Sequence, residues 1–183
     1  MRIVSGEFKG RRLISPPDYE IRPTGDKVKE AVFSIIMPYT DAGFKAVDLF
    51  AGSGSMGLEA ISRGASMVYF SDAARSSIAL IKENISLCGA SDRAFVLSGD
   101  FRNNIRRIKD EIDVYFIDPP YADGYIVPAL EEIRSSGNLK PGGLVICEHS
   151  PKEHLPEFIE GYQLLKTRTY GASSVSVYEK TEE

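Results

Sequence analysis

The chain has 183 residues, 43% of them hydrophobic and 26% charged, which is the length and composition of one globular domain with its own core. Its net charge of −4 argues against a protein that binds polyanions over its whole surface. With two cysteines and two histidines it lacks the residues for a disulfide framework or a histidine-rich metal site, and no apolar run reaches transmembrane length. The expectation is a cytoplasmic monomer with no metal and no membrane partner.

Positive charge is concentrated near the N-terminus. Glycines and prolines divide residues 1–23 into short strands and turns, which predicts a hairpin extension of a domain that spans residues 24–183. Lys9, Arg11 and Arg12 form the densest basic cluster of the chain. Such a cluster could contact phosphates or could simply be a solvated hairpin, and charge alone does not separate these two interpretations.

Strands and helices are expected to alternate after this segment. Apolar residues at helical spacing predict a helix over Asp26–Met37, which Pro38 ends. Short apolar strands are then expected at Ala46–Phe50, Met67–Ser71, Ala94–Leu97, Val114–Ile117 and Leu144–Glu148. Helices are expected between them, at about Gly57–Arg63, at Arg75–Leu87, just after Asp100 and at about Tyr125–Ser135. This alternation indicates a doubly wound, mostly parallel α/β sheet with helices on both faces.

The C-terminal part departs from the alternation. Two strand-like runs, Gln163–Thr169 and Ser174–Glu179, are separated only by the turn Tyr170–Ser173, which predicts an antiparallel hairpin. A parallel α/β sheet that ends in such a hairpin is unusual for a plain dinucleotide-binding domain.

A glycine-rich loop follows the first expected strand. Gly52, Gly54 and Gly57 have the spacing of a nucleotide-binding fingerprint, and Asp72 follows Gly52 by 20 residues. Glycines in such a loop let the chain turn sharply and let a ligand approach the backbone. The pattern suits NAD, FAD or S-adenosylmethionine. The loop residues expected at the cofactor are Phe50, Ala51, Gly52, Ser53 and Gly54.

Asp48 favours the last of these ligands. It ends the first strand, next to the expected ligand crevice. A carboxylate there repels a pyrophosphate but attracts the ammonium and sulfonium of S-adenosylmethionine, by about 4 kcal/mol for two charges roughly 4 Å apart near a protein surface. The alternative is that Asp48 only caps backbone amides of the loop.

Two more aspartates follow the next strands. Asp72 comes after the second strand and suits the ribose hydroxyls, and Asp100 comes after the third and suits the adenine amino group, with Phe101 beside the ring. Either aspartate alone could be a helix cap. Carboxylates at the ends of three successive strands share one crevice, which favours a common ligand.

A second motif, Asp118-Pro119-Pro120-Tyr121, follows the fourth strand. Its prolines fix the backbone and remove two donors. The Asp118 carboxylate and the Pro119 carbonyl can accept both hydrogens of an exocyclic base amine, while Tyr121 offers an aromatic face to the base. The motif therefore suits in-line methyl transfer to that amine, which depends on positioning and electrostatics and needs no metal. The alternative is an ordinary strand-to-helix turn.

The two motifs Asp48–Gly54 and Asp118–Tyr121 together resemble those of class I amino-methyltransferases. Three N-terminal segments, Arg2–Gly6, Lys9–Leu13 and Arg22–Phe33, resemble more specifically the bacterial 16S ribosomal RNA guanine-N2 methyltransferase family. This resemblance covers nearly the whole chain. Lysine keeps the charge but not the bidentate phosphate geometry at three positions where the family usually has arginine: Lys9, Lys27 and Lys29.

The resemblance implies a seven-stranded mixed sheet with an N-terminal hairpin extension. It implies S-adenosylmethionine as the cofactor and one guanine of 16S ribosomal RNA, in the small ribosomal subunit, as the substrate. Thr24 is then expected near the carboxylate of the cofactor's methionine, the alternative being that it only caps the helix that starts after it. Arg22 is expected to join the RNA-binding residues Lys9, Arg11 and Arg12. Three alternatives stay open: a DNA adenine-N6 methyltransferase, a non-catalytic nucleotide-binding RNA module and an NAD-dependent dehydrogenase.

Overall fold

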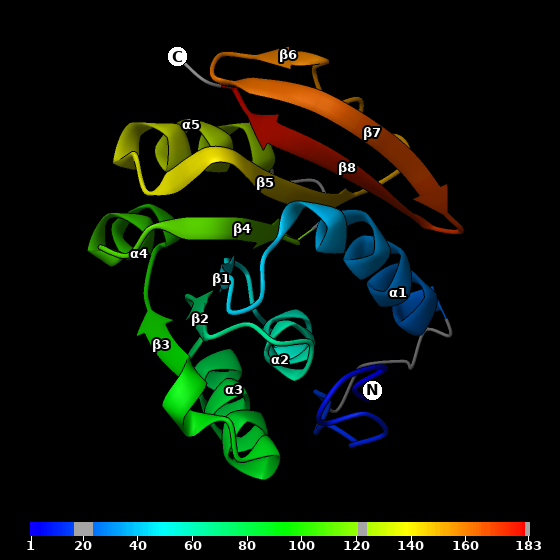
Figure 1. Ribbon diagram of the computed structural model, residues 1–183, viewed down its shortest axis with the longest axis vertical. Helices are drawn as coiled ribbons and strands as arrows, with labels where there is room; N and C mark the ends of the chain where they lie inside the picture. The colour runs from blue at the N-terminus through cyan, green and yellow to red at the C-terminus, as the bar shows by residue number, and fades with distance from the viewer. Residues whose placement is uncertain (17–23, 121–123, 182–183) are drawn as a thin grey trace.

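A single mixed sheet forms the middle of the protein in the computed structural model, which describes residues 1–16, 24–120 and 124–181. The strands in these ranges lie in the order β3-β2-β1-β4-β5-β8-β7-β6 (Figure 1). Their bounds are β1 Lys45–Asp48, β2 Met67–Asp72, β3 Ala94–Ser98, β4 Ile112–Ile117, β5 Leu139–His149, β6 Phe158–Ile159, β7 Tyr162–Tyr170 and β8 Ser173–Lys180.

The strand directions confirm the predicted fold class. Neighbours from β3 to β5 are parallel, and β8 is antiparallel to both β5 and β7. The sheet is therefore doubly wound and mostly parallel, with a C-terminal antiparallel hairpin. One strand was not expected: β6 has two residues and pairs only with Tyr162 and Gln163 of β7. A strand this short shows no periodicity in the sequence, and it raises the strand number within the described ranges to eight.

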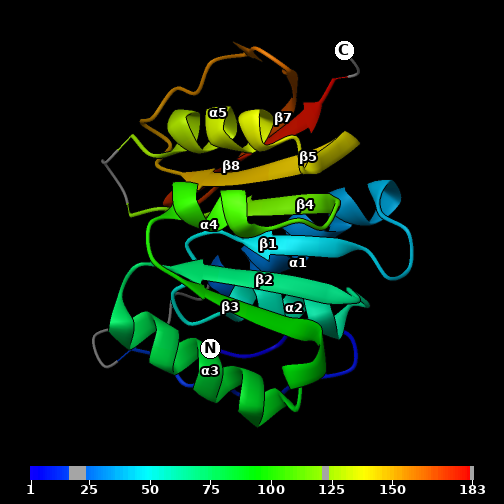
Figure 2. The ribbon, with the colours of Figure 1, turned by 90° about the vertical axis from the view of Figure 1, so that its left-hand side faces the viewer.

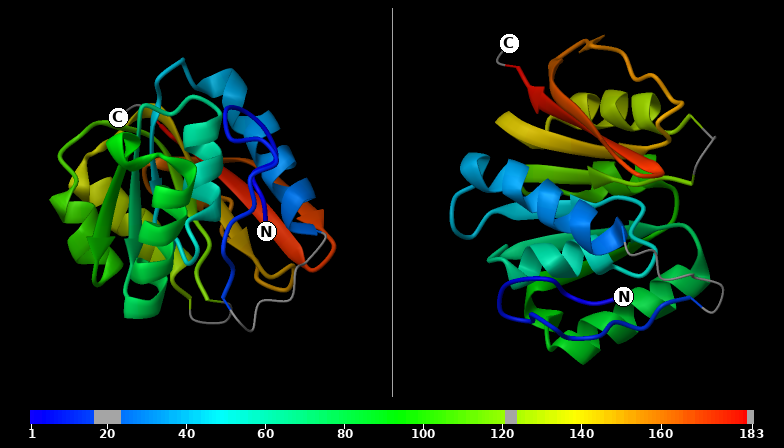
Figure 3. Two further views of the ribbon diagram at one scale, coloured as in Figure 1. Left: turned by 90° about the horizontal axis from the view of Figure 1, so that it is seen from below. Right: turned by 90° about the vertical axis from the view of Figure 1, so that its right-hand side faces the viewer.

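Helices cover both faces of the sheet. Their bounds are α1 Thr24–Ile36, α2 Ser55–Ser62, α3 Arg75–Cys88, α4 Phe101–Arg107 and α5 Ile126–Ser136, with short 3-10 helices η1 Met37–Tyr39 and η2 Ser91–Arg93. Helices α4 and α5 pack on one face (Figure 2), and α1, α2 and α3 pack on the other (Figure 3). No helix in the described ranges is both long and apolar enough to span a membrane.

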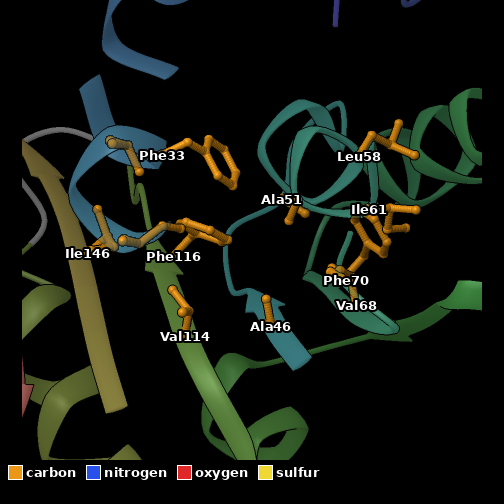
Figure 4. Close-up of a cluster of buried hydrophobic side chains, with 14 of the residues drawn as sticks. Phe33, Ala46, Ala51, Leu58, Ile61, Val68, Phe70, Val114, Phe116 and Ile146 are labelled. Carbon is orange, nitrogen blue, oxygen red and sulfur yellow. The ribbon is translucent and has the colours of Figure 1, made fainter. Parts of the chain in front are cut away.

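Strand β4 shows how the sequence creates two cores. Val114 and Phe116 face the helices α1, α2 and α3, while Tyr115 and Ile117 face α4 and α5. This is the period of two of a strand buried on both sides. On the α1 side, the ring of Phe33 lies 5.7 Å from that of Phe116, between centroids (Figure 4). These contacts fix α1 above the carboxyl end of β4.

The N-terminal segment is packed into the protein rather than projecting from it. Ile3, Phe8 and Leu13 are buried and belong to the core under α1, α2 and α3. An antiparallel bridge between Arg2 and Arg12 closes the segment as a hairpin. The described part of the predicted extension therefore shares the core of the main domain.

Buried polar groups of α2 hold this segment in place. Glu59 is fully buried, and its carboxylate accepts the backbone amides of Val4 and Ser5 at 2.8 and 3.0 Å. The Ser62 hydroxyl donates to the Ser5 carbonyl at 2.6 Å. Gly6 has a φ of 81° and lies so close to α2 that a Cβ atom there would be 1.8 Å from the Ser62 carbonyl oxygen. The hairpin is therefore anchored to α2 by hydrogen bonds and by close packing.

Candidate functional site

A cavity of about 970 Å³ opens at the carboxyl ends of β1, β2, β4 and β5. This is the edge of an open α/β sheet at which ligands bind. Most residues that the sequence assigned to the site line the cavity: Asp48, Phe50, Ala51, Gly52, Ser53, Asp72, Asp100, Phe101, Asp118, Pro119 and Pro120. Both predicted motifs thus meet in one place, although 70 residues of sequence separate Asp48 from Asp118.

Each glycine of the loop has a different structural role. The Gly52 amide donates to the Asp72 carboxylate at 2.9 Å. Gly54 does not line the cavity; it is the N-cap of α2 with a φ of 78°, a left-handed conformation that favours glycine. Gly57 allows α2 to approach β2, because a Cβ atom there would lie 2.3 Å from the Phe70 ring. Gly54 therefore shapes the loop behind the cavity.

Asp48 lies beneath this loop and is 3% exposed. Its Oδ2 accepts the Gly57 amide at 2.9 Å, so the capping role that the sequence left open is present. Burial raises the pKa of Asp48 to about 7, and the nearby Asp72 acts in the same direction, while the Gly57 hydrogen bond opposes both. A buried carboxylate with a raised pKa on a cavity wall is typical of a functional site.

Asp72 and Asp100 are held by backbone amides as well. Asp72 accepts the Gly52 amide through Oδ2 and the Ala74 amide through Oδ1, both at 2.9 Å. Asp100 is the N-cap of α4 and accepts the Arg102 amide at 2.9 Å. Both carboxylates also line the cavity, so capping does not remove them from it. Each oxygen still has lone pairs for a hydroxyl or amino donor.

Three aromatic rings form one wall of the cavity. The Phe50 ring lies 5.3 Å from that of Phe101 and 5.7 Å from that of Tyr125, between centroids. The Phe101 and Tyr125 rings meet edge to face at 6.0 Å. The Arg102 guanidinium lies over the Phe101 ring, 4.4 Å from its centroid. Such a wall suits a planar heteroaromatic group.

The described part of the second motif, Asp118-Pro119-Pro120, also lines the cavity. Asp118 and Pro120 are exposed, and Pro119 between them is buried. Asp118 follows β4 directly and both prolines come next, as the sequence predicted. Tyr121 and Arg22 lie outside the described residues, and so does the side chain of Thr24, whose backbone begins α1.

Lys29 is a lining residue that the sequence did not assign to the cavity. Its side chain is 7% exposed, and Nζ lies 3.7 Å from Glu59 Oε2 and donates to the Ser55 hydroxyl at 3.1 Å. Desolvation lowers the pKa of Lys29, and the Glu59 carboxylate opposes that shift. Because Lys29 is buried and bound within the protein, the loss of bidentate phosphate geometry that we expected from lysine in place of arginine has no consequence at this position. Its burial depends on the N-terminal segment, since Nζ also donates to the Arg2 carbonyl.

Two further lining residues, Tyr125 and Glu148, were also missed. Glu148 is near the carboxyl end of β5, next to β4 in the sheet, so the strand-end rule that selected the aspartates could have found it. Tyr125 is recognisable only from its ring partners in two other segments.

The predicted RNA-binding residues of the hairpin are not equivalent. Lys9 and Arg12 are exposed. The Arg11 guanidinium donates to the Leu87 carbonyl near the end of α3 at 2.7 Å and lies 5.6 Å from the centroid of the Phe8 ring. Part of its hydrogen-bonding capacity is therefore used within the protein.

Metal-ligating residues do not cluster in the part of the chain that the structure describes: no group of three or more histidine, cysteine, aspartate or glutamate side chains could hold an ion. His149 is buried, with Nε2 2.9 Å from the Ser176 hydroxyl, and both cysteines are buried and free.

With this geometry established, comparison with known proteins identifies the family. Residues 1–179 match the family described as Conserved hypothetical protein 95. The chain belongs to this family. The Bacillus subtilis protein named "Putative rRNA methyltransferase YlbH" is 34% identical over 183 residues, covering 98% of this chain and 99% of that protein. The Haemophilus influenzae protein named "Ribosomal RNA small subunit methyltransferase D" is 33% identical over 182 residues, covering 98% of this chain and 93% of that protein.

The solved structures agree with the sequence relatives. The Escherichia coli protein named "Putative methyltransferase yhhF" superimposes with a TM-score of 0.86 at 27% identity, covering 100% of this chain and 99% of that one. The fold is that of the class I methyltransferases, and the family resemblance predicted from the N-terminal segments is confirmed.

Proposed function

We propose that this protein transfers a methyl group from S-adenosylmethionine to the exocyclic N2 amine of a guanine in 16S ribosomal RNA. The observation that carries the proposal is one cavity lined by the strand-end carboxylates, the glycine loop and Asp118-Pro119. The names of the relatives point to RNA of the small ribosomal subunit. The resemblance to the guanine-N2 family supports the base and the atom.

The residues of the cavity fit this cofactor. When bound, S-adenosylmethionine supplies a methyl group activated by a sulfonium. Asp48 would bind the cationic methionine portion of the cofactor. The Gly57 amide holds its buried carboxylate through Oδ2, which leaves Oδ1 to face the ligand. Asp72 would accept the ribose hydroxyls, and Asp100 the adenine amino group. Phe50, Phe101 and Tyr125 would then line the adenine site.

The target amine would be bound by the Asp118 carboxylate and the Pro119 carbonyl. Accepting its two hydrogens moves the nitrogen lone pair out of conjugation with the base and toward the methyl carbon. The nitrogen would form the new N–C bond as the S–C bond of the donor breaks to release S-adenosylhomocysteine, and the nitrogen would then lose one proton. Asp118 is exposed and can pass that proton to water. Preorganised acceptors of this kind lower the barrier without a covalent intermediate.

RNA binding is the part of the proposal that lies outside the cavity. The base has to leave its stack to reach Pro119, and Tyr121 is proposed to stack against it. Lys9 and Arg12 are exposed on the hairpin and remain proposed phosphate contacts, as does Arg22, with Arg11 contributing less because it also binds the Leu87 carbonyl. Thr24 remains a proposed contact to the methionine carboxylate, near the N-terminus of α1.

The substrate class can be tested by methyl transfer from labelled S-adenosylmethionine. Small ribosomal subunits from a strain that lacks the modification should be labelled, whereas large subunits and duplex DNA should not. Labelling of DNA alone would favour the DNA adenine-N6 methyltransferase. No transfer to any of them, with tight binding of NADH and none of S-adenosylhomocysteine, would overturn the proposal.

A further inference from the structure

A second hollow lies between β7 and the segment formed by α1 and η1. It has a volume of about 540 Å³. We call it the α1–β7 groove: its strand side is Lys166, Arg168 and Tyr170, and its helix side includes Ser34 and Tyr39. None of these residues was assigned to the site from the sequence.

The groove exists because β7 is an edge strand over most of its length. The short strand β6 pairs only with Tyr162 and Gln163, so among the described residues the rest of β7 has a strand on one side only. Opposed residues of an antiparallel pair point to the same face of a sheet. Lys166 is opposite Val177 and Arg168 is opposite Val175, and both valines belong to the core under α1. The two cations therefore emerge beside α1, where that core ends.

The groove is basic on a chain that is acidic overall. The net charge of the chain is −4, yet the strand side of the groove carries Lys166 and Arg168. Within residues 1–16, 24–120 and 124–181, neither side chain makes an ion pair. Lys27 is exposed one helical turn before Ala31 and adds a third cation toward the start of α1. Glu30 is an acidic residue on the same helix, and its negative charge offsets one of these three positive charges.

The groove and the active cavity are lined by neighbouring residues of the same two segments. Tyr170 lines the groove, and the next residues of the same turn, Ala172 and Ser173, line the cavity. On α1, Val28 and Lys29 line the cavity, while Ala31 and Ser34 line the groove. Figures 1 and 3 show the start of α1 beside the turn between β7 and β8. A chain leaving the cavity over this turn would enter the groove.

We propose that the α1–β7 groove binds the RNA strand that flanks the target base. Lys166 and Arg168 would contact its phosphates. Tyr39, which is 52% exposed, would offer its ring for stacking against an unpaired base. This inference rests on the proposed function, because it takes the substrate to be RNA. The competing explanation is that a lysine and an arginine on an open edge only prevent strand pairing between molecules.

The test is salt-titrated binding of deproteinised small-subunit RNA to the full-length protein. Each phosphate contact contributes about 0.7 to the slope of log affinity against log salt for single strands. The double variant Lys166→Ala/Arg168→Ala should therefore bind more weakly, with a slope flatter by about 1.4. The matched control Lys82→Ala/Lys152→Ala removes two exposed lysines elsewhere and should change the slope much less. Tyr39→Ala should weaken binding with little change in slope.

Other outcomes would overturn the inference. Equal slopes and affinities for wild type and the groove variant would mean that RNA docks elsewhere. Self-association of the variant with unchanged RNA binding would establish edge protection. Loss of binding to intact subunits but not to free RNA would assign the groove to a ribosomal protein. Calorimetry with S-adenosylhomocysteine checks that the variants are folded. Methyl transfer by the wild type to small subunits tests the proposed function separately.

Discussion

The two sides of the active cavity are built differently. On the cofactor side, Asp48, Asp72 and Asp100 each accept a backbone amide at 2.9 Å, so each also holds the loop or helix that it faces. On the target side, Asp118 is exposed and follows β4 directly. The cofactor side is thus preorganised by the same carboxylates that are proposed to bind the ligand. Substitutions there should alter binding and local structure together, whereas substitution of Asp118, the proposed acceptor of the target amine, should act mainly on the reaction.

The largest effect is expected for Asp118→Ala. Losing an acceptor that acts in the transition state should reduce the rate of methyl transfer by about 10²–10³. Affinity for S-adenosylhomocysteine should stay within about twofold, because Asp118 is proposed to bind the target amine and not the cofactor. Single-turnover transfer and calorimetry measure the two quantities, with the exposed Asp41→Ala as control. A variant with near-normal turnover would remove Asp118 from the mechanism.

Asp72→Ala should act mainly on cofactor binding. Hydrogen bonds to a charged group contribute about 1.5–3 kcal/mol, so the Kd for S-adenosylhomocysteine should rise by roughly 10- to 100-fold. The Gly52 amide also loses its acceptor, which should loosen the loop. Calorimetry measures the Kd, and Asp92→Ala, whose side chain is 79% exposed, is the control. An unchanged Kd would leave Asp72 as a loop cap only.

Asp48 should make cofactor binding depend on pH. Because burial raises its pKa to about 7, the free protein is largely protonated there at pH 6 and largely ionised at pH 8. An ammonium binds the ionised form, so affinity for S-adenosylhomocysteine should fall by up to roughly tenfold from pH 8 to pH 6. Asp48→Asn keeps an acceptor for Gly57 and should bind weakly with little pH dependence. Equal wild-type Kd values at both pH values would contradict a direct contact.

Asp100→Ala should have the smallest effect of the four. Loss of the α4 cap should lower the free energy of unfolding by about 1 kcal/mol, and Asp100→Asn, also a good cap, should restore most of it. Because the Asp100 side chain is 48% exposed, affinity for S-adenosylhomocysteine should fall only by about two- to fivefold. Thermal unfolding and calorimetry check both parts. A loss of affinity as large as that of Asp72→Ala would place Asp100 among the main binding groups.

The parts of the fold that the sequence predicted are those with a repeating pattern. Alternating apolar strands and helices identified β1 to β5, and the turn Tyr170–Ser173 identified the hairpin of β7 and β8. The bounds of α1 shifted by two residues at the start and one at the end, to Thr24–Ile36, and Pro38 falls in the 3-10 turn that follows. The two residues of β6 were invisible because their strand depends on pairing with β7.

The site could be predicted where a residue follows the carboxyl end of a strand, because that position alone places it at the cavity. Asp48, Asp72 and Asp100 follow from the strand-end rule, and the structure brings all three to one cavity. Lys29 was missed because its burial depends on a hairpin that is distant in sequence. The hydrogen bond from Arg11 to the Leu87 carbonyl was missed for the same reason, because Leu87 is distant in sequence. Contacts between distant segments are set by packing and leave no local pattern.

The central claim is that the acceptor is the N2 amine of a guanine in small-subunit RNA. It is tested most directly by digesting the methylated RNA to nucleosides and identifying the labelled one by mass spectrometry. The proposed arrangement of Asp118 and Pro119 around a guanine amine predicts N2-methylguanosine in RNA from small subunits treated with the wild-type protein, and its absence after treatment with Asp118→Ala. Label in N6-methyladenosine, or in a methylated ring nitrogen or ribose, would contradict it.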